Sequence, residues 1–287
     1  MKLTRAKLLE TIRRKNDGWT SYKVRKIAGI STRRVDQIYA EYLETGEIPE
    51  LGRKMGRPNR PITLQETKMI DMTYKRYRVC ADALEPIIKR DYGIHIPHNH
   101  IHKVLLKLGH STKMRIQHIR KKTWKRYERR HSLTAVHIDW HFCGKKRIWV
   151  FTVIDDASRK VLASLECDRR STTMSIRGMN HALRHGKIKQ CISDHGAEFT
   201  SSKNGKSRFA TYLASKGIKQ ILCRVKHPQS NGKIEKWFDL YNRHRWSFNS
   251  NSAFLKWYNE VRPHRSLRFQ ELETPQLAFE RKMKTEV

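Results

Sequence analysis

The hydrophobic positions in the first part of the chain recur at the spacing of amphipathic helices. In "STRRVDQIYAEYLETG", residues 31–46, one apolar stripe follows the i, i+3, i+4, i+7 rule and consists of Val35, Ile38, Tyr39 and Tyr42. Ser31 stands before the stripe, where a serine caps a helix, and a turn at residues 28–30 separates it from a shorter helix. The pattern predicts two helices joined by a tight turn.

The opposite face of the predicted second helix is basic and polar, with Arg33, Arg34 and Gln37. A helix with one buried face and one such face is typical of the recognition helix of a helix-turn-helix DNA-binding unit. We therefore predict a DNA-binding domain over residues 1–48. A plain helical hairpin with a solvated basic face is the alternative, because short patterns of this kind also occur by chance.

The stretch "PELGRKMGRPNRPIT" is rich in Gly, Pro and Arg and predicts a basic linker over residues 49–62. Its "GRP" core, which contains Arg57, resembles an AT-hook, in which an extended segment enters a narrow minor groove. A flexible basic linker without a DNA contact is equally compatible with these residues.

A second helical unit is predicted over residues 63–110, beginning at a cap on Thr63. Its apolar stripes are Met69, Ile70, Tyr74 and Tyr77, then Leu84, Ile87 and Ile88. A third helix follows in "HNHIHKVLLKLG", with Asn99 as the expected cap. The same logic predicts a second helix-turn-helix, with DNA contacts from Asn99, His100 and Lys103. The histidines of this run also invite a zinc interpretation, but no second ligand pair lies nearby in the sequence.

The pattern changes after a basic connector at residues 111–132. Short runs rich in β-branched and aromatic residues follow: "LTAVHIDW", "KRIWVFTVID" and "KVLASLEC", the last two joined by a predicted hairpin turn "DDASR". Helices then alternate with the strands "KQCISD" and "IKQILCRV". This order predicts an α/β domain over residues 133–248, with a mixed sheet flanked by helices, and a helical tail over 249–287.

Three carboxylates stand out in this α/β domain. Asp139 lies inside an apolar strand, Asp194 ends another, and Glu235 opens a helix at the edge of its apolar stripe. A carboxylate in such a strand costs several kcal/mol in desolvation unless it is paired or bound to a cation. Oxygen ligands suit Mg²⁺ or Mn²⁺, and two such ions activate a nucleophile and stabilise a leaving oxygen in phosphodiester displacement.

Other polar residues nearby have more ordinary interpretations. Asp155 and Asp156 are expected to form the hairpin turn rather than to bind metal. Glu198 lies one helical turn beyond Asp194 and is a further candidate for the site, whereas Lys233 is a candidate contact to a DNA phosphate.

The composition supports a nucleic-acid partner. The 287 residues contain 61 Lys and Arg against 27 Asp and Glu, a formal net charge of +34. A chain with this charge repels itself unless a polyanion neutralises it, and each neutralised phosphate releases counterions. Five cysteines without a CxxC pair indicate reduced thiols. No stretch is long enough to span a bilayer, so we expect a cytoplasmic, nucleoid-associated protein without a membrane partner.

Together, "HIDW", "SDHGAEF" and "HPQSNGKIEKW" resemble the three acid blocks of the DDE transposases and retroviral integrases. The order of the blocks, the two helical units before them and the tail "WYNEVRPHRSL" to "ETPQLAF" resemble insertion-sequence transposases. The resemblance implies a ribonuclease H-like catalytic core with Asp139, Asp194 and Glu235 as catalytic and metal-binding residues. The spacing 235 − 194 = 41 exceeds the tightest pattern of the family, and the extra residues are expected in "TSSKNGKSR".

The resemblance implies a DNA transposase that cleaves the 3′ ends of an element and joins them to target DNA, using two Mg²⁺ or Mn²⁺ ions. Its partners would be double-stranded DNA, namely terminal inverted repeats and target, and further copies of the chain in a homo-oligomer that bridges two ends. Two alternatives remain: an inactive DNA-binding regulator derived from a transposase, and a nuclease of the same fold without strand transfer.

Overall fold

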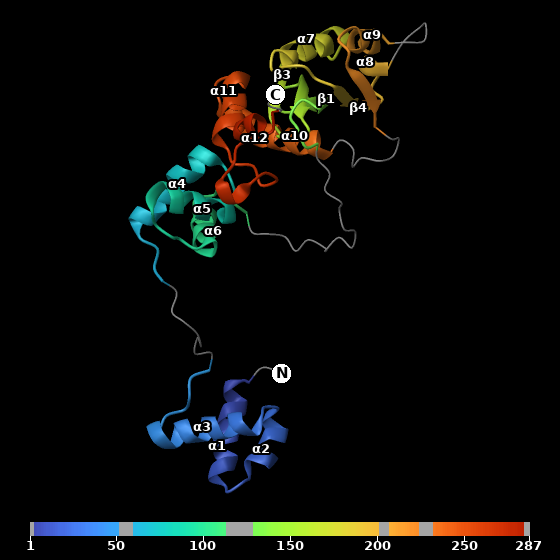
Figure 1. Cartoon of the computed structure of the whole chain (residues 1–287). Helices are drawn as coiled ribbons and strands as arrows, with labels where there is room; N and C mark the ends of the chain where they lie inside the picture. Colours follow the sequence, from blue (N-terminus) through green and yellow to red (C-terminus); the bar gives the residue numbers. More distant parts are fainter. Residues whose placement is uncertain (1–2, 52–59, 113–128, 201–206, 224–231, 284–287) are drawn as a thin grey trace. The chain divides into compact units, whose positions relative to one another are not determined.

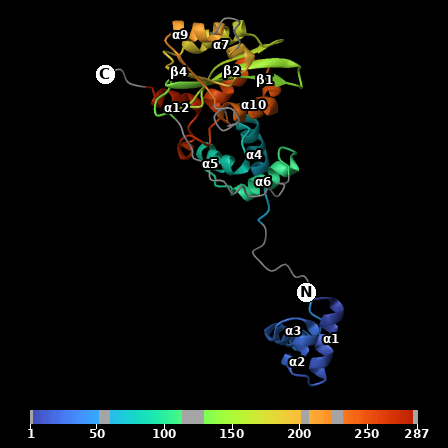
Figure 2. The same ribbon diagram turned by 90° about the vertical axis from the view of Figure 1, so that its right-hand side faces the viewer.

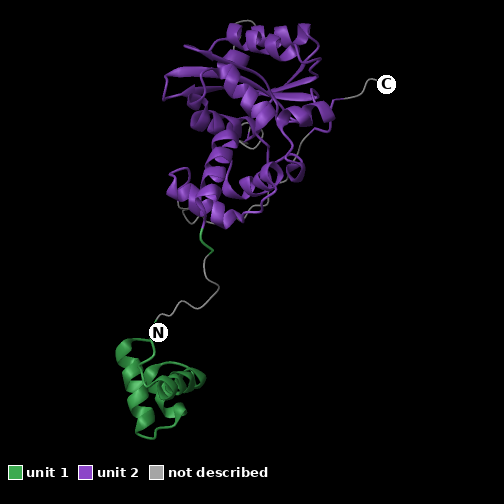
Figure 3. Cartoon of the chain, turned by 90° about the vertical axis from the view of Figure 1, so that its left-hand side faces the viewer, with its two compact units in different colours: residues 1–61 green, residues 62–287 purple. Residues whose placement is uncertain are grey.

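The computed structural model of the chain describes residues 3–51, 60–112, 129–200, 207–223 and 232–283. These residues form two compact units, Met1–Pro61 and Ile62–Val287 (Figure 3). The predicted AT-hook-like contact at Arg57 and most of the predicted connector lie outside the described residues. None of the described helices is long and apolar enough to cross a bilayer.

The first unit consists of helices α1 (Arg5–Asn16), α2 (Ser21–Ala28) and α3 (Thr32–Thr45) (Figure 1). Leu8 and Ile12 of α1 pack against Ile38 of α3, which forms a small apolar core. The hydroxyl of Ser31 accepts a hydrogen bond from the Arg34 N–H at 3.2 Å, so the predicted cap is confirmed. Between α2 and α3 the chain turns at Gly29, whose φ of +69° favours glycine.

The second unit begins with helices α4 (Leu64–Tyr77), α5 (Ala81–Tyr92) and α6 (His98–Lys107). Their buried faces include most of the predicted apolar stripes: Ile70, Tyr77, Leu84, Ile87 and Ile88. The predicted cap at Thr63 is confirmed as a full capping box, because Thr63 and Glu66 each accept the backbone N–H of the other, at 3.1 and 3.0 Å.

The predicted cap at Asn99 is wrong. Helix α6 starts at His98, its N-cap residue is Pro97, and Asn99 lies inside the first turn. The N–H of His98 donates instead to the carboxylate of Glu85 on α5, at 3.0 Å. A side chain from a neighbouring helix thus satisfies a backbone donor that local sequence assigns to Asn99.

The α/β domain contains one five-stranded sheet with the strand order β3-β2-β1-β4-β5. The bounds of its strands are β1 Ala135–Cys143, β2 Ile148–Asp155, β3 Val161–Cys167, β4 Gln190–Ser193 and β5 Lys219–Leu222. Strand β2 is antiparallel to both β1 and β3, whereas β4 is parallel to both β1 and β5. This mixed sheet with flanking helices fits the predicted ribonuclease H-like core.

Helices cover both faces of the sheet (Figure 2). One face packs against α7 (Thr172–Leu183) and α9 (Arg208–Ser215), with Phe151 and Met179 in the shared core. The other face packs against α10 (Gly232–His244) and α11 (Asn251–Lys256), with Val150 and Trp237 in a second core. The short helix α8 (Ala197–Thr200) follows β4.

The C-terminal stretch connects the sheet to the helices α4–α6. The indole N–H of Trp257, in a π-helical turn (Trp257–Val261), donates to the carbonyl of Arg76 at 2.7 Å. Leu272 is buried among the α4–α6 residues, and Phe279 of α12 (Pro275–Arg281) packs into the core beneath α7. The predicted tail is therefore an integral part of the second unit.

Candidate active site

Strand β1 turns its odd-numbered side chains toward α10. Val136 and Ile138 belong to the core on the α7 side. His137 reaches Asp156, which in turn binds Lys233 of α10, and His141 contacts Asn242 of α10 at 3.0 Å. Because side chains alternate along a strand, Asp139 lies on the same face as these histidines and between them. Asp139 therefore points to the side of the sheet on which α10 carries Glu235.

The parallel pairing of β1 with β4 places Asp194 beside Asp139. The register matches Val136 with Cys191 and His137 with Ile192. Two residues further along each chain stand Asp139 and Asp194, at the carboxyl end of β4. Two carboxylates that are far apart in the sequence thus become neighbours at one edge of the sheet.

Helix α10, which carries Glu235, is held to the sheet near both of its ends. At its start, Lys233 pairs with the buried carboxylate of Asp156. At its end, the hydroxyl of Tyr241 donates to Glu166 of β3 at 2.6 Å, and Arg245 just beyond the helix pairs with the same carboxylate at 2.6 Å. Ile234 and Trp237 are buried against the sheet, whereas Glu235 is exposed on the helix surface.

The electrostatics of Asp139 indicate that the three carboxylates act on one another. Burial and the charges of Asp194 and Glu235 raise the pKa of Asp139 to about 7, against a weaker opposing hydrogen bond from the Trp140 N–H at 2.7 Å. A carboxylate that is half-buried beside two like charges is costly to ionise. A bound cation would remove this cost, and this is the behaviour expected of a metal ligand.

The donor set fits a hard cation. Among the described residues, no three His, Cys, Asp or Glu side chains converge closely enough to hold a metal ion together. Mg²⁺, however, commonly takes only one or two protein carboxylates and completes its shell with waters and substrate phosphates. Asp139 and Asp194 supply such a pair, and Glu235 is close enough to influence the pKa of Asp139.

The turn after β4 orients Asp194. Its Oδ1 accepts the N–H of Gly196 at 2.9 Å, and the imidazole of His195 contacts the carbonyl of Cys223 at 2.8 Å. A Cβ at Gly196 would lie 3.0 Å from Asp194 Oδ1 and 3.3 Å from Glu198 Oε2. Glycine thus leaves room for these two carboxylates, and a Cβ here would require them to shift slightly. Glu198 itself pairs with Arg170 at 2.8 Å, which argues against its use as a metal ligand.

Asp155 and Asp156 have structural roles, as their position in the turn predicts. Asp155 accepts the N–H and the hydroxyl of Ser158, at 2.8 and 2.6 Å. Asp156 accepts His137 at 2.7 Å and the ammonium of Lys233. This buried ion pair argues against the predicted phosphate contact of Lys233.

The predicted DNA-contact residues lie on the helical units. Arg33, Arg34 and Gln37 are all exposed on α3, and Arg34 contacts Gln37 at 3.4 Å. Asn99 and Lys103 are exposed and His100 is half-buried, within adjacent turns of α6. The two histidines before them, His95 and His98, both contact Glu85. The DNA contacts stay predictions.

Local sequence signals do not reveal the network that anchors α10. The partners of Lys233 and Arg245 are Asp156 and Glu166, 77 and 79 positions away. The one available signal is the presence of an acid inside or directly after an apolar strand, a pattern that Asp156 and Glu166 share with Asp139 and Asp194.

Comparison with known proteins identifies an integrase core domain in this part of the chain. The family model described as the integrase core domain matches residues 129–228, a range that contains Asp139 and Asp194 and ends before Glu235. A putative integrase ORF3 of Spiroplasma virus SpV1-C74 is 28% identical over 153 residues, which cover 45% of this chain and 42% of that protein. The chain thus spans less than half of this relative. An uncharacterized protein of Archaeoglobus fulgidus is 26% identical over 97 residues, covering 34% of this chain and 78% of that protein.

Among solved structures, the catalytic core domain of BIV integrase matches with a TM-score of 0.42 and 15% identity, covering 52% of this chain and 94% of that chain. A simian T-cell lymphotropic virus intasome in complex with PP2A regulatory subunit B56 gamma matches with a TM-score of 0.47 and 14% identity, covering 76% and 75%. The family match falls on the α/β domain that contains the carboxylate pair. The chain therefore carries an integrase-like catalytic core.

Proposed function

We propose that this protein is a DNA transposase that cleaves the ends of a mobile element and joins them to target DNA. The observation that supports this most directly is the pairing of Asp139 with Asp194 across β1 and β4, with Glu235 near enough to raise the pKa of Asp139. An integrase-type core with such a set of carboxylates suits phosphodiester chemistry.

In the proposed reaction, a water oxygen bonds to phosphorus at the element's end while the bond from phosphorus to the 3′ oxygen breaks. The 3′ oxygen leaves with the electron pair and becomes a 3′-OH. That hydroxyl then attacks a phosphodiester of the target, again displacing a 3′ oxygen. No covalent bond to the protein is needed. Two bound Mg²⁺ or Mn²⁺ ions would activate the attacking oxygen and stabilise the leaving one.

The protein's own residues prepare this site. Asp139 and Asp194 would hold the cations from the sheet, and Glu235 would do so from α10. The ion pair of Lys233 with Asp156 and the contacts of Tyr241 and Arg245 with Glu166 fix the helix that presents Glu235. Because placement within a fraction of an ångström controls such reactions, this anchoring is part of the catalytic machinery.

The helical units would select the DNA. Arg33, Arg34 and Gln37 on α3 would read base edges at the terminal repeats, and Asn99, His100 and Lys103 on α6 would make further contacts. Joining two ends to one target requires two such sites. We therefore propose a homo-oligomer that bridges two ends.

The decisive experiment is a cleavage and strand-transfer assay with duplexes that carry the element's own ends. Asp139→Asn, Asp194→Asn and Glu235→Gln should each reduce both reactions to background while end binding persists. Asp239→Asn is the matched control for Glu235→Gln, because Asp239 is also exposed on α10 and lies one turn further along.

Each outcome of this assay has a distinct meaning. Near-normal turnover by Glu235→Gln would remove Glu235 from the proposed set. Cleavage by the wild-type protein without joining would identify a nuclease instead of a transposase. End binding by the wild-type protein with neither reaction in Mg²⁺ or Mn²⁺ would favour an inactive regulator.

A further inference from the structure

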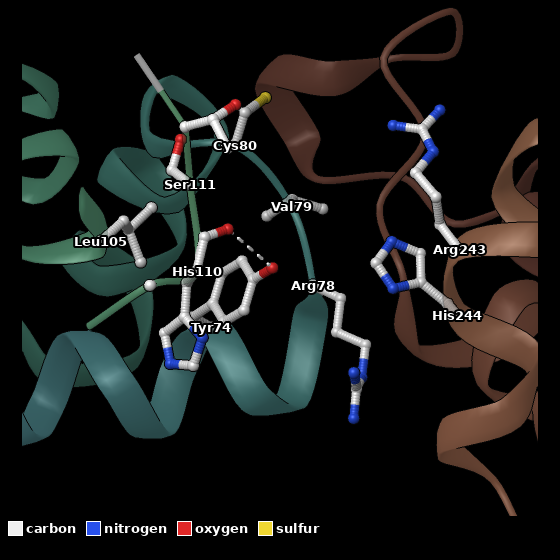
Figure 4. A pocket seen from close by; sticks show the side chains of 11 residues that line it. Tyr74, Arg78, Val79, Cys80, Leu105, His110, Ser111, Arg243 and His244 are labelled. Atoms are coloured by element: carbon white, nitrogen blue, oxygen red, sulfur yellow. Dashed lines mark hydrogen bonds between the residues drawn. The ribbon is translucent and has the colours of Figure 1, made fainter. Parts of the chain in front are cut away.

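A polar cavity lies where the α4–α6 helices meet the end of α10, whereas Glu235 lies near the start of that helix. It has a volume of about 370 Å³ and is lined on one side by Tyr74, Arg78 and His110 and on the other by Arg243 and His244. Figure 4 shows Tyr74 and Arg78 on the α4 side of the opening and Arg243 and His244 on the α10 side, with the guanidinium groups of the two arginines pointing toward different ends of the cavity. The remaining lining comes mainly from residues 79–80 and 109–112.

This cavity is strongly basic. Arg78 and Arg243 both line it, and among its described lining residues no carboxylate occurs. The nearby Asp71 is already paired with Lys75 at 2.6 Å and with His110 at 2.7 Å. The two guanidinium groups therefore line the cavity without a compensating anion from its described wall.

The guanidinium of Arg78 is held in place but is not fully satisfied. One of its terminal nitrogens donates to Ser247 at 3.2 Å, and the group lies 5.5 Å from the centre of the Phe248 ring. Within the described part of the chain, Nε of Arg78 and Nε of Arg262 are buried and lack a hydrogen-bond partner. Buried donors of this kind normally have one.

The backbone at Arg78 is also unusual. Helices α2, α3 and α5 end at Gly29, Gly46 and Gly93 in the left-handed region, whereas α4 ends at Arg78 with a φ of +47°. This conformation costs less with glycine than with any other residue. An arginine here is easiest to understand if its guanidinium has a ligand.

The pKa of the His244 imidazole also reflects the positive charge around this cavity. Burial, followed by the charges of Arg78, Arg262 and Arg243, lowers the pKa of His244 to about 4. The imidazole is consequently neutral at physiological pH. A bound anion would offset the repulsion among the three arginines.

We propose that this basic cavity binds the sugar-phosphate backbone of DNA, with Arg78 of α4 and Arg243 of α10 each contacting a phosphate. The planar guanidinium fork suits phosphate oxygens, and the two arginines lie on opposite walls of the cavity. The inference rests on the proposed function only in taking DNA as the partner. It adds a clamp, distant from the reacting carboxylates, that fixes the DNA relative to α10.

The shape of the surface favours a polymer over a free phosphate ion. Cys80 and Ser111 line both this cavity and a neighbouring one of about 550 Å³. The neighbouring cavity continues to His98, Asn99 and His102 on α6. A track that runs from α10 to α6 is longer than one phosphate and suits a sugar-phosphate backbone.

The first test is the salt dependence of DNA binding by the full chain, measured by fluorescence anisotropy with EDTA present so that no cleavage is required. Arg243→Gln should weaken binding several-fold and reduce the slope of log K against log salt by about 0.9, the value for one lost phosphate contact. Arg177→Gln, which removes an exposed arginine from α7 on the opposite face of the sheet, should leave both quantities unchanged. Equal slopes for the two variants would refute the clamp.

The second test uses the exposed thiol of Cys80, which lines the cavity. Duplex DNA should slow its alkylation, read by peptide mass spectrometry, in the wild-type protein and in Arg177→Gln but not in Arg243→Gln. Inorganic phosphate at the same phosphate concentration should give no protection. Protection by inorganic phosphate alone would replace the DNA clamp with a free-phosphate site, and equal protection in all three proteins would overturn the assignment.

The two proposals fail separately. Loss of cleavage in every assay with an unchanged Arg243→Gln slope effect would leave the clamp standing and remove the transposase chemistry. Normal cleavage without an effect of Arg243→Gln on the salt slope would remove the clamp and leave the transposase chemistry standing.

Discussion

The ammonium of Lys233 and the carboxylate of Asp156 form an ion pair beneath the first turn of α10, two residues before Glu235. Both groups are well shielded, with side-chain exposures of 13% and 1%. The pair ties the turn between β2 and β3 to the helix that carries the third acid. A contact between two residues outside the proposed metal ligands thus determines where one of those ligands lies.

Asp156→Asn should therefore destabilise the protein and slow cleavage. Breaking a buried ion pair costs about 3 to 5 kcal/mol, which should appear as a lower urea midpoint at neutral pH. Despite burial, hydrogen bonds from His137 and Lys233 hold the pKa of Asp156 below its ordinary value. The stabilisation is present above the pKa of the unfolded state and is lost as the pH falls, so the difference between variant and wild type should shrink in acid. Asp239→Asn is the control, and a full-strength difference at low pH would contradict this account.

The stability of the metal-free protein should fall as the pH rises from about 4 to about 7, to the extent that Asp139 controls it. The pKa of this carboxyl is raised in the folded state, so the folded protein binds more protons than the unfolded one in this window. Asp139→Asn should remove the trend and stabilise the metal-free protein by about 2 kcal/mol above neutral pH, roughly half of what a fully buried group would show. Thermal unfolding in EDTA at several pH values measures both effects.

Added Mg²⁺ should stabilise the wild-type protein more than Asp139→Asn, which is the reverse of the order expected without metal. The ionised form of Asp139 is the one that binds a cation, so metal affinity should rise with pH up to about 7. Wild-type protein should gain thermal stability from Mg²⁺, and Asp139→Asn should gain little. An equal gain in both proteins would show that the ion binds elsewhere.

Gly196→Ala should impair cleavage by at least tenfold with only a small loss of stability. The added methyl group would crowd Asp194 Oδ1 at 3.0 Å and displace the carboxylate from Asp139. Gly144→Ala is the matched control, because a Cβ there meets no atom within 4 Å. Single-turnover cleavage rates separate the two variants, and equal rates would mean that the position of Asp194 tolerates the shift.

Replacing Arg33 and Arg34 together with alanine should reduce discrimination between element ends and random DNA. Each well-placed base contact is worth about 1 to 3 kcal/mol, so a loss of tenfold or more is expected at fixed salt. Arg13→Ala, on the exposed surface of α1, should leave discrimination intact. If the double variant retains full specificity, recognition resides outside α3.

A mixture of this Arg33/Arg34 double variant with Glu235→Gln protein tests the proposed oligomer. If each core acts on the end bound by its neighbour, the mixture should recover part of the strand-transfer activity that neither variant shows alone. No recovery at any ratio would favour subunits that each process their own end.

Periodicity and capping chemistry were sufficient to predict the five strands and most of the longer helices from the sequence. The caps at Ser31 and Thr63 are local interactions over three residues, and the turn at Asp155 is equally local. Asp139 and Asp194 were also found as candidates by pattern, because both acids interrupt or end apolar strands, but their neighbouring positions depend on the parallel pairing of β1 with β4.

What the sequence did not predict depends on partners from distant elements. Glu85 replaced Asn99 as the group that satisfies the start of α6, although 13 positions separate it from His98. The sequence predicts Lys233 as a DNA-contacting surface cation, but in the fold its ammonium pairs with the buried carboxylate of Asp156. The basic cavity is a further case, since Arg78 and Arg243 line one cavity in a fold in which Trp257 and Leu272 join the α4–α6 helices to the α/β domain.

The parallel pairing of β1 with β4 determines the stage of folding at which the proposed active site can form. Strands β2 and β3 and helix α7 all intervene between the two strands in the chain. A nascent polypeptide that has emerged only as far as β3 possesses Asp139 without its neighbour. The carboxylate pair forms only when β4 pairs with β1, and helix α10, which carries Glu235, follows β4 and β5 in the chain. Under the proposed function, DNA cleavage requires a nearly complete fold. Fragments truncated before β4 lack Asp194 and should not cleave DNA.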